Sequence, residues 1–201
     1  MPSIKNFYRA GALITIARMA PIDRNFFTRH LCETRDAFVS SVQDVSEEQS
    51  CFKPAPDRWS IQGCVEHLAL AEHGLLRQII DNSKPADAPG SREKETAILS
   101  SRGGDRKEKF MAPERAQPTG RFGSLEEAVR QFTAARERTI VYVTSCSDDL
   151  HMRSTMHPLL GPMRCSELLA FIVVHPLRHA EQIREVKASA GYPAGIHAAG
   201  Q

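Results

Sequence analysis

The chain has 201 residues, which is enough for one domain with a real hydrophobic core and short for two. Apolar residues make up 41% and charged residues 25% of the chain, ordinary globular values that exclude a fibrous or wholly disordered protein. The net charge of +2, with both signs interspersed, gives no basic surface of the kind that binds nucleic acid.

The five cysteines are scattered and form no C-x-x-C pair. Their odd number and spacing argue against a disulfide framework and favour reduced thiols in the cytoplasm. The longest apolar run, LLAFIVV at residues 168–174, is far shorter than the roughly 20 residues of a membrane helix. We therefore expect a cytoplasmic protein with no membrane or nucleic-acid partner.

Residues 1–20 are expected to form a poorly ordered N-terminal arm, and the folded domain to span residues 21–193, before a tail at 194–201. Within this domain four segments have helical periodicity and no stretch shows the sustained alternation of a strand, so the predicted class is all-α. The first helix is predicted from about Asp23 to Gln43. A loop containing two prolines ends it, because proline cannot continue a helix.

The second helix is predicted from Ser60, a good N-cap, to about Asn82. The third begins with the capping-box pattern of Ser124 and Glu127 and runs to about Cys146. Roughly forty residues rich in proline, glycine and charge connect these two helices. So long a connection is either a lid over a site or a solvated crossover between parallel helices.

The fourth helix is predicted from near Ser166 to Gly191, and it contains the sequence VVHPLRHAEQI at residues 173–183. His175 and His179 are four residues apart on its apolar face, so both rings point in the same direction. This is the geometry with which one helix gives two ligands to one metal ion. Two buried rings that pack only as core residues remain the alternative.

A third ligand is available on the second helix, where His67 lies among small residues that leave room around its ring. A single histidine on an apolar face is more often a hydrogen-bonded core residue than a ligand. His73 lies off this face and is expected at the surface, as are His151 and His157 in a proline-containing loop. Cys64 and Cys165 are interpreted as small buried apolar residues, and Cys64 lies one turn from His67.

Several short motifs occur in a characteristic order. They are W-S-I-x-x-x-x-E-H-L from residue 59, A-P-E-x-x-x-P-T-G-R-F from 112, F-x-x-A-R-x-R-T-I-x-Y-V from 132, H-P-L-L-G-P from 157 and H-P-L-R-H-A-E-Q-I from 175. In order and spacing the chain resembles the DinB-like, or YfiT-like, superfamily of metal-dependent enzymes.

This resemblance implies a four-helix bundle with up-down-down-up topology, in which a long crossover joins the second and third helices. It also implies a divalent ion, nickel or zinc, on His67, His175 and His179, and pairing into a homodimer. Pro176 departs from the family pattern, since proline inside a helix removes a hydrogen bond and bends the helix. The bundle either absorbs this bend, which we expect, or loses the metal site.

The expected function is a divalent-metal-dependent thiol S-transferase or hydrolase that acts on a small electrophile, with a low-molecular-weight thiol as a candidate cosubstrate. The alternative is a helical metal- or ligand-binding module that catalyses no reaction and takes part in a stress response. Gln182 lies on the histidine face as a candidate hydrogen-bond partner of a ligand. Glu66 is expected to be a surface carboxylate, and no catalytic acid or base is assigned.

Overall fold

The computed structural model describes residues 22–101 and 111–194. The expected arm at residues 1–20 lies outside the described residues, and so does the expected tail beyond residue 194. Both boundaries of the domain therefore stay predictions.

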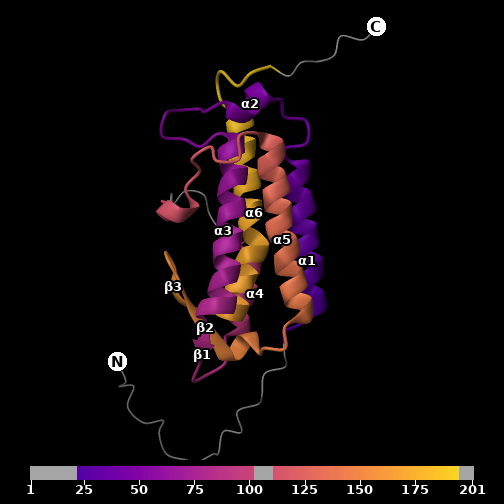
Figure 1. Cartoon of the computed structure of the whole chain (residues 1–201), viewed down its shortest axis with the longest axis vertical. Helices are drawn as coiled ribbons and strands as arrows, with labels where there is room; N and C mark the ends of the chain where they lie inside the picture. The colour runs from indigo at the N-terminus through magenta and orange to yellow at the C-terminus, as the bar shows by residue number, and fades with distance from the viewer. Residues whose placement is uncertain (1–21, 102–110, 195–201) are drawn as a thin grey trace, which may run out of the picture.

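Four long helices form the body of the molecule: α1 (Arg24–Ser40), α3 (Ile61–Asn82), α5 (Leu125–Ser145) and α6 (Cys165–Lys187). In Figure 1, α1 and α6 run in one direction along the bundle, and α3 and α5 run in the other. Each of α1 and α6 packs against α5 or α3, and α3 packs along its parallel neighbour α5. The bundle therefore has the expected up-down-down-up topology.

Side-chain caps mark the starts of three of these helices. Asp23, Ser60 and Ser124 each accept a hydrogen bond from a backbone amide in the first turn that follows, as their residue types favour. The predicted end of the fourth helix at Gly191 was wrong. In the structure α6 ends at Lys187, and the hydroxyl of Ser189 caps it by donating to the carbonyl of Val186.

The connection between α3 and α5 is a crossover, as two parallel neighbours require. Its described part contains the helix α4 (Arg92–Ser100) and the short 3-10 turn η1 (Glu114–Ala116). Because α4 packs against α6 and Ala116 is buried, the described part of this crossover belongs to the packed molecule and is not a solvated strap. A further short helix, α2 (Glu47–Cys51), lies at the end of the bundle where α3 begins (Figure 1).

The structure adds a small sheet to the expected helical fold. A small antiparallel sheet in the order β1-β2-β3 is formed by β1 (Lys84–Pro85), β2 (Arg153–His157) and β3 (Gly161–Arg164), and the 3-10 turn η2 (Leu150–Met152) leads into it. It lies toward the end of the bundle opposite α2 (Figure 1). Strands of two to five residues are too short to show a recognisable alternation of apolar and polar residues.

The apolar core fills the space between the four long helices. At the end near the sheet, α6 supplies more of it than any other element, and at the other end Phe38 and Phe132 pack edge to face with ring centroids 5.1 Å apart. The three predicted histidines lie between the middle of the bundle and this second end, because His67 is early on α3, His175 is at the middle of the antiparallel α6 and His179 is one turn further.

Candidate metal centre

Three histidine side chains converge inside the bundle. One ligand nitrogen each of His67, His175 and His179 lies within 4.8 Å of the other two. Nε2 of His175 is 3.4 Å from Nε2 of His67 and 3.1 Å from Nε2 of His179. The structure thus brings together the three residues that the sequence pattern selects.

The other ring nitrogen of two of these histidines is held by an oxygen. Nδ1 of His67 donates to the backbone carbonyl of Ala116 at 2.7 Å, and Nδ1 of His179 donates to the side-chain oxygen of Gln182 at 3.0 Å. Each oxygen only accepts, so the proton resides on Nδ1 and the lone pair of Nε2 points toward the centre of the triad. The expected contact between Gln182 and the histidine face is confirmed.

Aromatic rings enclose the triad. Trp59, from the loop before α3, lies 4.8 Å from the His67 ring and 6.1 Å from the His179 ring, measured between centroids. Phe171 stacks on His175 at 5.0 Å. These contacts restrict the rotation of all three imidazoles and keep their surroundings apolar on these sides.

Burial favours the neutral form of two of these imidazoles. It lowers the pKa of His67, although the hydrogen bond to Ala116 acts in the opposite direction. The pKa of His175 lies well below its ordinary value, first because protein atoms surround the ring and then because His67, His157 and Arg136 would repel a positive charge there. Neutral imidazole is the form that binds a metal ion.

Glu66 is not the surface carboxylate that the sequence led us to expect. Its side chain is 1% exposed, and it accepts hydrogen bonds from the backbone amides of Thr119 and Gly120, both at 2.9 Å. The guanidinium of Arg121 lies 3.3 Å away. Glu66 therefore holds the loop just after η1, whose Ala116 carbonyl binds His67, and the helical position alone could not show that this loop folds back over it.

His151 and His157 are also buried, contrary to the expectation of surface positions. Nδ1 of His151 lies 2.9 Å from a carboxylate oxygen of Glu95 on α4, so this ring joins the crossover to the turn before the sheet. Nδ1 of His157 accepts the backbone amides of Leu159 and Leu160 and so closes the turn between β2 and β3. The partner of His151 lies far away in the sequence, and the partners of His157 lie in the short turn that follows it.

The predicted positions of His73 and of two cysteines are confirmed. His73 is exposed on α3. Cys64 and Cys165 are buried among apolar residues.

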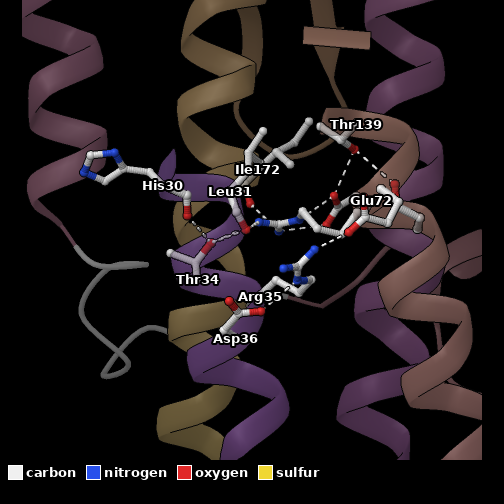
Figure 2. A network of polar contacts seen from close by, with 11 residues as sticks. His30, Leu31, Thr34, Arg35, Asp36, Glu72, Thr139 and Ile172 are labelled. Carbon is white, nitrogen blue, oxygen red and sulfur yellow. Dashed lines mark hydrogen bonds and ion pairs between the residues drawn. The ribbon is translucent and has the colours of Figure 1, made fainter. Parts of the chain in front are cut away.

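Next to the triad lies a buried polar network centred on Arg136 of α5, which is fully inaccessible to solvent. Its guanidinium forms a two-pronged ion pair with Glu72 of α3, at 2.7 and 2.8 Å. It also donates to Leu31 and Thr34 on α1, and to the backbone carbonyl of Ile172 on α6. Figure 2 shows the partners of this network arriving from different helices of the bundle.

Sequence reasoning assigned no role to Trp59, Ala116 or Arg136. Trp59 and Ala116 act through a ring face and a backbone carbonyl, for which a sequence carries no signal. For Arg136 the sequence does carry a signal, because the residue lies four positions after Phe132 and seven before Val143, on the buried face of α5. A charged side chain on a buried stripe indicates a buried partner.

In the two stretches that the structure describes, no helix combines the length and the apolarity that crossing a membrane requires.

Comparison with known proteins shows a family and proteins of similar sequence or fold. YuaE of Bacillus subtilis is 24% identical over 155 residues, which cover 77% of this chain and 93% of YuaE. The solved structure of YfiT from Bacillus subtilis, described as a probable metal-dependent hydrolase with an unusual four-helix bundle topology, covers 94% of this chain and 97% of its own at a TM-score of 0.55. At 13% identity this second likeness shows a shared fold. Residues 30–183 match the DinB superfamily, and the chain belongs to that superfamily.

Proposed function

We propose that this protein is a divalent-metal-dependent enzyme that hydrolyses a small electrophilic substrate or transfers a thiol to it. One observation carries the proposal: three Nε2 atoms meet in the bundle, while carbonyl oxygens hold the Nδ1 protons of His67 and His179. The Nε2 lone pairs of His67 and His179 therefore both face the centre of the triad, where a cation would be bound by both rings.

Two of the three nitrogen separations fit a common ion, and the third, between His67 and His179, lies within the 4.8 Å spread of the triad. Zinc–nitrogen bonds of about 2.0–2.1 Å in a tetrahedral site place two ligand nitrogens about 3.3 Å apart. The measured separations from Nε2 of His175 are 3.4 and 3.1 Å. Imidazole donors suit zinc and nickel, and three of them leave a coordination position open for water or substrate.

A divalent ion supplies Lewis acidity, which lowers the pKa of a water or thiol ligand and polarises the substrate. The residues of the chain supply the binding and the orientation. His67, His175 and His179 would hold the ion, Ala116 and Gln182 fix two of these rings, and Trp59 and Phe171 exclude water from the ring faces.

Hydrolysis and thiol transfer share this machinery and differ in the nucleophile. The description of YfiT as a probable metal-dependent hydrolase supports the first. The resemblance to family members that activate a low-molecular-weight thiol supports the second.

The metal content of the protein tests the proposal. Protein purified without a histidine tag and dialysed against zinc or nickel is expected to hold about one ion per chain by mass spectrometry. His67→Ala and His179→Ala should abolish this binding. His73→Ala is the matched control, since His73 lies exposed on the same helix as His67 and should leave the metal content unchanged. Wild-type protein that stays metal-free would overturn the proposal.

Turnover by the metal-loaded protein distinguishes hydrolysis from thiol transfer. Consumption of bacillithiol, mycothiol or glutathione in the presence of an electrophile panel is expected for a transferase, and release of acid from esters or amides without thiol for a hydrolase. A loaded protein that does neither is a metal-binding module without catalysis, and the enzymatic part of the proposal fails.

A further inference from the structure

Pro176 lies inside α6, one residue after the candidate ligand His175. In a regular helix the amide of residue 176 would donate to the carbonyl of Ile172, four residues earlier. Proline has no such amide, so this carbonyl loses its helical donor. A buried carbonyl without a donor costs free energy and leaves the turn loosely held.

The structure supplies another donor to that carbonyl. Nη2 of Arg136 donates to the oxygen of Ile172 at 3.1 Å. Ile172 is 1% exposed and Arg136 is fully buried, so water does not compete for this bond. The donor missing from α6 is thus replaced by a side chain of α5.

Arg136 is itself held rigidly. Its five N–H groups make five hydrogen bonds: two to Glu72, one to the Leu31 carbonyl, one to Thr34 and one to Ile172. These partners lie on α1, α3 and α6, and Thr139 of α5 braces the Glu72 carboxylate at 2.9 Å (Figure 2). The guanidinium therefore has one position relative to all four long helices.

We propose that Arg136 is a positioning residue of the metal centre: by bonding the Ile172 carbonyl that Pro176 leaves without its helical donor, it fixes the turn of α6 that carries His175. This inference rests on the proposed metal site. Proline keeps the carbonyl available for the arginine, and the arginine keeps this turn in one conformation. His175 then meets His67 of α3 and His179 of its own helix.

A double-mutant cycle tests this role. Arg136→Lys keeps the charge but cannot reproduce the five-donor fork. Pro176→Ala restores a backbone amide that can donate to the Ile172 carbonyl. In the Pro176 background Arg136→Lys should weaken zinc binding, measured by chelator competition, about tenfold or more. In the Pro176→Ala background the same substitution should weaken it less than about threefold. Equal losses in both backgrounds would overturn the proposal.

Thr139→Val is the matched control. It removes a buried hydrogen bond to Glu72 in the same network but does not touch the Ile172 carbonyl. It should lower the unfolding temperature and weaken zinc binding clearly less than Arg136→Lys does. A loss of affinity equal to that of Arg136→Lys would mean that general loosening of the network, and not the bond to Ile172, controls the site.

A readout from the metal-free protein separates this proposal from the function proposed above. The imidazole nitrogen resonances of His175 should be single and sharp in the parent, doubled or broadened in Arg136→Lys, and single again when Pro176→Ala is added. If the parent binds no metal, the proposed function fails and these spectra alone decide the positioning role. Unchanged His175 signals in Arg136→Lys would overturn it.

If Arg136→Lys does not fold, the pair Glu72→Met with Arg136→Met replaces it in the same cycle. Removing both charges together leaves no unpaired carboxylate in the core, and such replacements of a buried ion pair are often neutral for stability. The same rescue by Pro176→Ala is expected, and its absence contradicts the proposal.

Discussion

The carboxylate of Glu66 accepts the backbone amide of Gly120 at 2.9 Å, across 54 residues of sequence. The same side chain binds the amide of Thr119, so an acidic residue of α3 fixes the loop that follows η1. That loop continues from the Ala116 carbonyl bound by His67. A residue adjacent to a candidate ligand in sequence thus supports it through a separate segment of the chain.

Glu66→Gln should destabilise the fold by about 1–3 kcal/mol, because the amide replaces one of two acceptor oxygens with a donor that faces a backbone N–H. Zinc affinity should fall as well, since the Ala116 carbonyl is less firmly held. Denaturant unfolding and chelator competition measure the two effects. Glu126→Gln, at an exposed position of α5, should change stability by less than about 0.5 kcal/mol. If Glu66→Gln is as stable as the parent, the carboxylate does not hold this loop.

Gln182→Ala should weaken metal binding about tenfold with little loss of stability, because it frees the His179 ring that its oxygen orients. Titration with zinc in the presence of a competing chelator measures the change. Gln131→Ala removes a comparable side-chain hydrogen bond on α5, to Glu127, and should leave the affinity at the parent value. Parent-like zinc affinity in Gln182→Ala would show that His179 needs no such partner.

Trp59 should report the metal by its fluorescence. It is the single tryptophan of the chain, and its ring lies 4.8 Å from that of His67. Nickel and cobalt have open d shells that quench an excited ring at such short range, whereas zinc has a filled shell and should alter the intensity only slightly. The quenching should saturate at one equivalent and be lost in His67→Ala. Equal quenching in that variant would place the ion elsewhere.

The metal-free protein should lose stability as the pH falls below neutrality, in part through His157. Burial, and then the positive charge of Arg115, lower the pKa of His157 to about 4. Between the unfolded value of about 6.5 and this folded value, the unfolded chain binds a proton that the folded chain does not. Stability therefore falls as the pH drops through this window, by up to about 2 kcal/mol at pH 5 from this ring.

His157→Asn tests that contribution, because asparagine keeps an acceptor oxygen and does not titrate. Urea unfolding at pH 7 and pH 5 should show a smaller loss in the variant than in the parent. A residual loss is expected in both, since the pKa values of His67 and His175 are also lowered. If parent and variant lose the same amount, His157 is not the titrating group.

The sequence predicts the parts of this molecule that depend on local periodicity. The four long helices, their caps at Ser60 and Ser124, and the shared face of His175 and His179 all follow from spacing. The topology and the grouping of His67 with the other two come from the family resemblance and from a stripe of small residues.

The rest depends on contacts between distant segments. Nothing near Glu66 shows that residues 119–121 return to cover it, and nothing near Ile172 shows that Arg136 faces its carbonyl. Pro176 looks damaging when α6 is considered alone. Its effect on the site can be judged only with the neighbouring α5 in place.

His67 and His175 are 108 residues apart, and no disulfide joins the five cysteines, all of which lie in the described part of the chain. An ion held by both rings therefore closes a loop of more than half the chain. An ion that binds the folded chain and not the unfolded one stabilises the fold by mass action, by about 2.7 kcal/mol at a free concentration 100 times its dissociation constant. The ion would thus be the only strong cross-link across the described parts of this chain, and a chelator would act on it as a reducing agent acts on a disulfide-linked protein.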